Sequence, residues 1–208
     1  MKPLYPENEE QRLAALALYN ILDTAEEQAY DDLTNLAAYI AQTPVAIISM
    51  IDKNRQWYKS RVGLSVSEVP RELTFCGHAI LDPSTPTMVP DARLDKRFLD
   101  NPAVTVDQGV RFYGGFPLVT EGSFAIGTLC VVDHKPRNLS AEQIEALAAL
   151  TRHAVLLLEI RRQVFALDSV IDRRNKQVEK SNEFDEMDQI DKITKKLENL
   201  LHEKRVSG

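Results

Sequence analysis

A cysteine and a histidine lie two residues apart in the stretch FCGHAI, residues 75–80. The chain has only two cysteines and four histidines, so Cys76 and His78 are the first candidates for chemistry. These residue types serve in three kinds of site: a nucleophile with its base, a metal site, and an anchor for a cofactor. Each kind makes a different demand on the surrounding sequence.

A nucleophilic pair requires the two side chains to touch, with a third group orienting the base. If residues 75–80 are helical, side chains two positions apart point about 200° away from each other. Cys76 falls instead on one apolar face with Phe75, Ala79 and Ile80. We therefore interpret Cys76 as a small packing residue. His78 then faces either solvent or a pocket.

A structural zinc site needs about four ligands and a catalytic one about three. The available residues are Cys76 with His78 and Cys130 with His134. Cys130 and His134 do not have a usual ligand spacing, and Cys130 lies in the apolar run GTLCVVD, which reads as a buried strand. We predict no metal site. A redox pair of Cys76 and Cys130 is kept as the basis of a third functional alternative.

The composition is that of an ordinary globular protein. With 208 residues, the chain is long enough for one domain and an extension. Hydrophobic residues make up 44% and charged residues 27%, and the net charge is −6. No basic face indicates nucleic-acid binding, no apolar run approaches the roughly 20 residues of a membrane span, and the N-terminus lacks the apolar core of a secretory signal. We expect a cytoplasmic protein that binds neither nucleic acid nor membranes.

The order of the expected elements indicates an α+β fold. Helices are expected at residues 13–21, at 24–40 and from 141 onward, and strands at 45–52, 56–61, 109–120 and 123–133. Thr24 with Glu27, and Ser140 with Gln143, have the spacing of capping boxes before two of these helices. Short turns between successive strands favour a central antiparallel sheet with flanking helices.

A heptad pattern typical of a coiled coil follows the last expected strand. The predicted dimer seam consists of Leu150, His153, Leu157, Ile160, Val164, Leu167, Ile171 and Val178. Because the seam continues far past the strands, it favours a homodimer, joined by this helix and the N-terminal one, over a helix packed only on its own sheet. From Ser181 the seam is polar and a new apolar stripe begins at Met187, so we predict a break or phase shift near residues 180–189.

Six ordered segments carry a resemblance to a known family. They are RLAALALYNILDTAEEQAYDDLTNLAA, PVAIISMIDKNRQWYKSRVGL, PRELTFCGHAIL, MVPDARLDKRFLDNPAV, RFYGGFPLVT and IGTLCVVDHKPRNLSAEQIEAL. Together they resemble a bacterial GAF domain, a sensory module that often precedes histidine kinases and cyclic-nucleotide or cyclic-dinucleotide enzymes. The resemblance implies a central antiparallel sheet with helices on one face, a ligand pocket on the other, and dimerisation through flanking helices. We divide the chain into a GAF domain, residues 1–162, and a helical signalling tail, residues 163–208.

The resemblance also bears on the cofactor. Phytochrome-like GAF domains attach a bilin through a cysteine that histidine follows immediately. Here Gly77 separates Cys76 from His78, as in GAF relatives with the pattern Phe-Cys-small-His that carry no chromophore. We therefore expect a GAF domain without a covalent bilin, and we predict no other cofactor.

A pocket is expected between the loops of residues 63–109 and the sheet, where aromatic rings stack on a ligand and charged groups fix its polar edges. The candidate ligand-binding residues are Trp57, Phe75, His78, Asp91, Phe98, Arg111 and Tyr113. The leading hypothesis is a non-catalytic sensory and regulatory protein that binds an unidentified small molecule. It would signal through a dimeric helical bundle to a downstream protein docked on the tail. The alternatives are a dimerisation or adaptor module without a ligand, and a thiol-dependent redox enzyme using Cys76 and Cys130.

Overall fold

The computed structural model describes the backbone of residues 2–206 and the side chains of residues 2–180, 187 and 189–196. The chain divides into two compact units, Met1–Arg162 and Gln163–Gly208. The helices are α1 (Glu9–Ala17), α2 (Gln28–Ala41), α3 (Cys76–Ala79), α4 (Pro102–Thr105) and α5 (Ala141–Val206), with a 3-10 turn η1 (Arg71–Leu73). The strands are β1 (Val45–Ile51), β2 (Arg55–Val62), β3 (Glu68–Pro70), β4 (Thr87–Val89), β5 (Phe112–Val119) and β6 (Ala125–Asp133).

The six strands form one antiparallel sheet in the order β3-β2-β1-β6-β5-β4. β1 and β6 lie at its centre, and nearly every residue of these two strands is buried. Their β-branched and apolar residues suit this position because both faces of a central strand are covered. The structure confirms the predicted α+β fold with a central antiparallel sheet and flanking helices.

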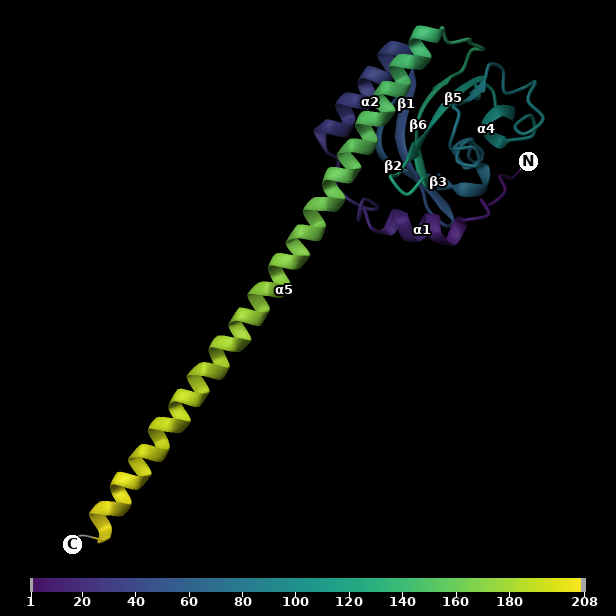
Figure 1. The fold of residues 1–208 in the computed structure, drawn as a ribbon. Helices are drawn as coiled ribbons and strands as arrows, with labels where there is room; N and C mark the ends of the chain where they lie inside the picture. The colour runs from purple at the N-terminus through teal and green to yellow at the C-terminus, as the bar shows by residue number, and fades with distance from the viewer. Residues whose placement is uncertain (1, 207–208) are drawn as a thin grey trace. The chain divides into compact units, whose positions relative to one another are not determined.

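The two faces of the sheet are covered differently. α2 and the N-terminal part of α5 lie side by side over one face, whereas α3, α4 and long loops cover the other (Figure 1). We call these the helix-covered face and the loop-covered face. Alternate residues of one strand serve opposite faces: Ile48 packs in the helix-covered core and Ile47 in the loop-covered core.

The two capping boxes expected from the sequence have different outcomes. Ser140 and Gln143 cap α5 reciprocally, because the amide of each residue donates to the side chain of the other. The expectation that Thr24 caps the second helix is wrong. Glu27 is the residue before α2, and the Thr24 hydroxyl donates to the carbonyl of Ile21 instead. Thr24 therefore stabilises the turn that precedes α2.

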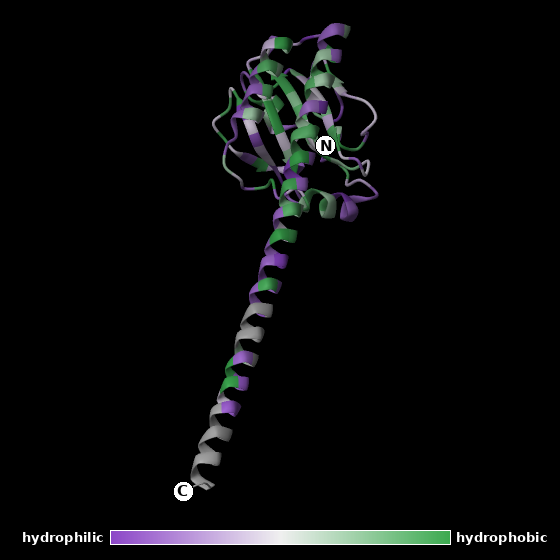
Figure 2. Cartoon of the chain, turned by 60° about the vertical axis from the view of Figure 1, so that its left-hand side comes forward, coloured by the Kyte–Doolittle hydropathy of each residue, from purple (hydrophilic) through white to green (hydrophobic). Residues whose placement is uncertain are grey.

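Helix α5 is continuous from Ala141 to Val206, so it does not break at residues 180–189, and a phase shift there stays a prediction. Leu150 and Leu157 pack against the helix-covered core, whereas the described seam residues from Ile160 to Val178 are about half exposed. Figure 2 shows apolar residues recurring among hydrophilic ones along the described part of the helix. The side chain of Ser181, from which the seam is predicted to be polar, lies outside the described residues.

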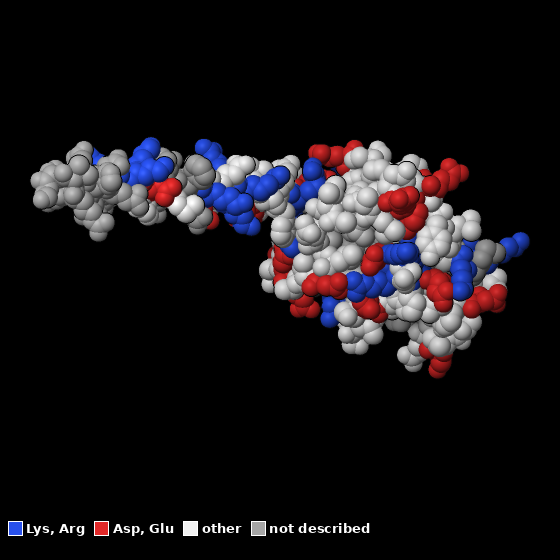
Figure 3. Space-filling view, turned by 90° about the horizontal axis from the view of Figure 1, so that it is seen from below, with Lys and Arg blue, Asp and Glu red and all other residues white. Residues whose placement is uncertain are grey.

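Charged side chains of both signs are interspersed on the face of the domain seen in Figure 3. Arg55, for example, contacts the carboxylates of Asp23, Asp52 and Glu68. Exposed pairs of this kind contribute little stability individually.

Within residues 2–206, no helix carries an apolar stretch long enough to cross a bilayer.

Candidate functional site

A cavity of about 310 Å³ lies on the loop-covered face of the sheet. Its walls come from β1, β2, β3, β5 and β6, and from the loops that carry η1, α3 and α4. The lining is mostly apolar. It comprises Val45, Ile47, Gln56, Tyr58, Leu64, Val66, Val69, Pro70, Leu73, Thr74, Phe75, Cys76, Asn101, Pro102, Ala103, Val110, Tyr113, Cys130, Val132 and His134. An apolar cavity with a few polar groups is the usual form of a small-molecule site.

Four buried polar side chains converge at one wall of this cavity. The Tyr113 hydroxyl donates to Cys76 Sγ at 3.3 Å, and Gln56 Nε2 donates to the same sulfur at 3.1 Å. The Sγ atom of Cys130 lies 3.6 Å from that of Cys76. Both cysteines are free thiols. Cys76 therefore lies at the centre of a polar cluster, although the sequence indicated only apolar packing for it.

The cluster extends behind the cavity wall along the sheet. Gln56 Nε2 also donates to the Ser49 hydroxyl at 2.9 Å, and that hydroxyl lies 3.2 Å from the hydroxyl of Thr128. β1, β2 and β6 each contribute one of these residues. Because a buried polar group without a partner is costly, each member holds the others in place.

The pKa values of the two thiols are shifted in opposite directions. Burial by itself raises the pKa of Cys76, but hydrogen bonds with Cys130, Thr128, Tyr113 and Gln56 outweigh it, and the pKa is lowered. The pKa of Cys130 is raised well above its ordinary value, first by the hydrogen bond with Cys76 and then by burial. The pKa of Tyr113 is also raised well above its ordinary value, chiefly by burial. Tyr113 is therefore a stable hydrogen-bond donor toward Cys76.

Two glycines make this arrangement possible. A Cβ atom at Gly115 would lie 2.1 Å from the Tyr113 hydroxyl, so only glycine leaves room for that ring. A Cβ atom at Gly77 would lie 2.8 Å from the ring of Pro3 and 3.0 Å from the Thr74 hydroxyl. The Gly77 amide donates to that same hydroxyl. Gly77, which separates Cys76 from His78, is thus needed for packing.

The cavity brings together two of the seven predicted ligand-binding residues, Phe75 and Tyr113. Phe98 is fully buried and stacks on Phe75 with ring centroids 4.0 Å apart, so it supports the wall from behind. His78 contacts the edge of Phe98 at 4.9 Å between centroids and does not line the cavity. As expected from the helical spacing, the side chains of Cys76 and His78 point in different directions: Cys76 lines the cavity and His78 does not.

The other three predicted residues lie elsewhere. Trp57 packs in the core of the helix-covered face. Asp91 forms an ion pair with Arg93, and Arg111 donates to the carbonyls of Val104 and Val110. Ligand binding by any of the seven stays a prediction.

The sequence analysis missed Gln56 and Tyr58, which line the cavity on either side of Trp57 in β2. The signal was available, because residues that flank a core-facing strand residue point to the opposite face. It also missed Thr74, Asn101 and His134, which line the cavity from loops where no periodic pattern applies.

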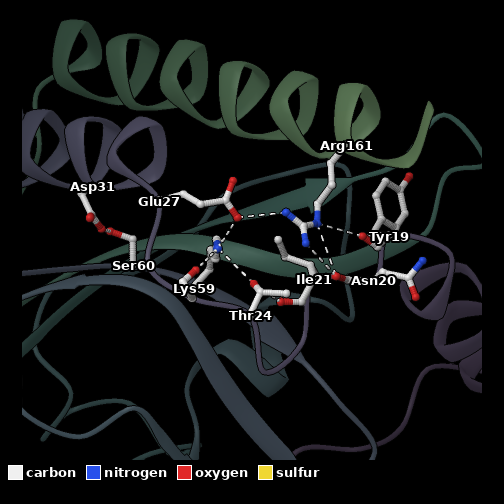
Figure 4. A network of polar contacts seen from close by, with 10 residues as sticks. Tyr19, Asn20, Ile21, Thr24, Glu27, Asp31, Lys59, Ser60 and Arg161 are labelled. Carbon is white, nitrogen blue, oxygen red and sulfur yellow. Dashed lines mark hydrogen bonds and ion pairs between the residues drawn. The ribbon is translucent and has the colours of Figure 1, made fainter. Parts of the chain in front are cut away.

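A second polar network lies on the helix-covered face (Figure 4). The Lys59 side chain is fully buried and donates to Glu27, to the Thr24 hydroxyl and to the Ala25 carbonyl. Glu27 also binds Arg161 of α5 at 2.9 Å, and Arg161 donates to the carbonyls of residues 19 and 20. One carboxylate thus joins β2 to α5.

Lys59 reaches this face because of a β-bulge. Ile48 of β1 pairs with Ser60 and the next residue, Ser49, pairs with Tyr58, so Lys59 is an extra residue. Tyr58 lines the cavity, while Lys59 and Ser60 both contact groups of the helix-covered side.

Within the part of the chain that the structure describes, no three His, Cys, Asp or Glu side chains gather as metal ligands would.

Comparisons with known proteins agree with this architecture. Residues 25–158 match the GAF domain family. The GAF domain from a phosphoenolpyruvate-protein phosphotransferase of Coxiella burnetii superposes with a TM-score of 0.57 at 14% identity, over 76% of this chain and 97% of that one. The GAF domain from an Acinetobacter phosphoenolpyruvate-protein phosphotransferase gives 0.53 at 18% identity, over 75% and 98% of the two chains. At these identities the likeness shows the fold alone.

One curated relative corrects the sequence analysis. A Pseudomonas aeruginosa protein named as a cyclic di-GMP phosphodiesterase is 39% identical over 141 residues, which cover 68% of this chain and 24% of the relative. The prediction that the chain is no enzyme is contradicted by that name. The chain spans only about a quarter of the relative's length, so the name does not establish an activity for this chain. The family match covers more than half of the sequence and coincides with the sheet and its helices, and the chain belongs to the GAF domain family.

Proposed function

We propose that this GAF sensory module binds a small, largely apolar molecule in its cavity and passes the occupied state to α5. In this proposal the module regulates an enzymatic output, and turnover of cyclic di-GMP is the first candidate because of the relative's name. The observation that carries the proposal is the cavity of about 310 Å³ with its buried polar wall. A volume of this size suits a small metabolite.

The polar wall supports recognition of one chemical class. Tyr113 and Gln56 supply a hydroxyl and an amide, and Asn101 and His134 line other parts of the cavity. These groups both donate and accept hydrogen bonds, whereas no lysine, arginine or carboxylate among the described residues lines the cavity. A neutral, mainly apolar ligand with one or two polar atoms therefore fits better than an anion.

A short path connects the cavity to α5. Tyr58 lines the cavity, the next residue Lys59 binds Glu27, and Glu27 binds Arg161. A ligand that moves β2 at Tyr58 therefore shifts the position of the Lys59 ammonium. A ligand changes such an equilibrium only if it binds the two arrangements with different affinity.

A homodimer through α5 is the second part of the proposal. Val164, Leu167, Ile171 and Val178 are each half exposed or more in the single chain, and they repeat with heptad spacing. A second helix would bury this stripe. Replacing Ile171 by Asp should convert a dimer to a monomer in light scattering after gel filtration. Asp172→Asn, at the adjacent exposed residue, is the control, and a monomeric unaltered chain would contradict the dimer.

The test of ligand binding is recovery of a molecule from the purified chain. Mass spectrometry of an extract should identify one molecule, and adding it back should raise the melting temperature of the ligand-free chain. Val132→Phe places a ring in the cavity and should abolish both results. Val106→Phe, at a position that is 54% exposed, should leave both results unchanged.

Recovery of the same molecule from the Val132→Phe chain would place binding outside the cavity. If the unaltered chain yields no molecule, and no candidate metabolite shifts its melting temperature, the ligand-binding part of the proposal is wrong. The dimer would then be tested by itself.

A further inference from the structure

Cys76 and Cys130 are far apart in the sequence but meet at the cavity wall. Their Sγ atoms are 3.6 Å apart, one on the short helix α3 and the other on the central strand β6. Each residue is at most 2% exposed, yet both line the cavity, so a small molecule inside the cavity lies next to both residues. The chain contains no other cysteine.

The surroundings of Cys76 differ from those of an inert buried cysteine. A thiol in apolar surroundings is held in its neutral form, because burial disfavours the thiolate. Here an amide N–H of Gln56 and the hydroxyl of Tyr113 both point at Cys76 Sγ. Donors aimed at a sulfur stabilise its thiolate. The lowered pKa of Cys76 and the raised pKa of Cys130 agree with this geometry.

We propose that Cys76 and Cys130 form a reactive dithiol, which a small hydroperoxide entering the cavity oxidises to an intramolecular disulfide. Cys76 has the environment of an attacking thiolate, with two donors directed at its sulfur. Cys130 lies where a second thiol must lie to resolve the product. This chemistry goes beyond ligand binding and signalling, and it requires only that a small hydroperoxide reach the cavity.

The reaction has two balanced steps. First, the Cys76 thiolate attacks one oxygen of the hydroperoxide, the O–O bond breaks, and the departing oxygen takes up a proton to leave as an alcohol or water. Cys76 becomes a sulfenic acid. Second, the Cys130 sulfur attacks Cys76 Sγ, the S–O bond breaks, and water leaves with the sulfenic oxygen and the Cys130 proton. The two sulfurs lose two electrons in total, and the peroxide receives them.

The test uses the full, reduced chain treated with hydrogen peroxide and then denatured for intact-mass measurement. The expected product has lost two hydrogen atoms, has no free thiol, and yields a single cross-linked peptide pair containing Cys76 and Cys130. Dithiothreitol should restore the starting mass. Cys130→Ser should stop after the first step, leaving a Cys76 sulfenic acid that dimedone traps.

A matched pair of tyrosine variants tests the role of the donors. Tyr113→Phe removes the hydroxyl that donates to Cys76 and should slow thiol loss about tenfold, as expected for one hydrogen bond to a charged group. Tyr39→Phe is the control, because it removes a hydroxyl from a side chain of α2 that is 81% exposed and does not line the cavity. Its rate should match that of the unaltered chain. Circular dichroism checks that both variants are folded.

Several results would overturn the proposal. One is survival of both thiols at peroxide concentrations that fully oxidise free glutathione. Another is a disulfide between two chains in place of the internal one. A third is oxidation of Cys130→Ser without a trappable sulfenic acid. Equal slowing in Tyr39→Phe and Tyr113→Phe would show that the hydrogen bond from Tyr113 to Cys76 does not govern the rate.

Discussion

The two faces of one sheet are built by different means in this GAF domain. The helix-covered face is filled by α2 and α5 and carries a buried ion-pair network around Lys59. The loop-covered face retains a cavity of about 310 Å³ beside a buried dithiol. Long helices present continuous apolar stripes that fill a sheet surface. Loops with short helices leave space, which explains why the cavity lies on the loop-covered face.

The largest expected difference between the faces concerns two neighbouring residues of β1. Ile48→Ala should lower the free energy of unfolding by about 4 kcal/mol, because Ile48 lies in a filled core. Ile47→Ala should cost only about 2 kcal/mol, since Ile47 already borders empty space and loses fewer contacts. Urea denaturation of both variants measures the difference. Equal costs would show that the two faces are equally well packed.

The next effect concerns Glu9, which joins helix α1 to the turn η1. It pairs with Arg12 of its own helix α1 and with Arg71 of η1, and both arginines are almost fully buried. Burial by itself raises the pKa of Glu9, but hydrogen bonds and charge interactions with the two arginines lower it from 4.5 to about 2. Glu9→Gln should therefore cost about 2–3 kcal/mol at neutral pH.

The stabilisation by Glu9 should decrease as the pH is lowered. Because the folded-state pKa is the lower one, the stabilisation by Glu9 is fully present above pH 4.5 and is lost as the pH falls toward 2. The difference in unfolding free energy between the unaltered chain and Glu9→Gln should shrink over that interval. A constant difference from pH 6 down to about 2 would contradict the assigned pairing.

Glu27→Gln tests the network of the helix-covered face and should cost about 2 kcal/mol. This is below the roughly 3–5 kcal/mol of a fully buried pair, because the Glu27 side chain is 41% exposed. Glu26→Gln is the control, since Glu26 is 71% exposed and lies 3.5 Å from Arg61, and about 0.5 kcal/mol or less is expected. Similar losses of unfolding free energy in both variants would show that the Glu27 pairs stabilise the fold no more than ordinary surface ion pairs do.

The smallest expected effect is on the loop-covered face. Tyr113→Phe removes one hydrogen bond to Cys76 and should cost about 1 kcal/mol in thermal or urea unfolding. The ring itself stays packed, since Gly115 leaves room for it. A loss as large as that of Ile48→Ala would mean that the hydroxyl holds the entire cavity wall.

Sequence patterns predicted the parts of this molecule that depend on local order. Strands β1, β2, β5 and β6, the Ser140–Gln143 cap and the different directions of Cys76 and His78 follow from residues near one another in the chain. The same kind of reasoning misplaced Trp57 as a cavity residue, because it did not apply the alternation of β2 to choose a face. The domain division and the dimer seam stay predictions.

The contacts that define the candidate site are of another kind. Cys76 meets Cys130 only after α3 has been placed against β6, and no spacing in the sequence indicates this. Thr24 and Glu27 had the right spacing for a capping box, but the buried Lys59 ammonium binds both side chains, and the helix starts one residue after Glu27. Tertiary contacts outweighed local propensity at both places.

The bulge at Lys59 has one more consequence. Ser60 pairs with Ile48, and Tyr58 pairs with Ser49. A chain without residue 59 would therefore retain a regular ladder, in which all the remaining residues of β2 point to the same face of the sheet as they do now. Lys59 is therefore an insertion that the pairing of β1 with β2 does not require. Insertion of a single codon for this lysine is enough to connect β2 to α5 through Glu27 while the cavity wall stays as it is. Related domains that lack this one residue would then share the cavity but not the contact between β2 and α5 through Glu27.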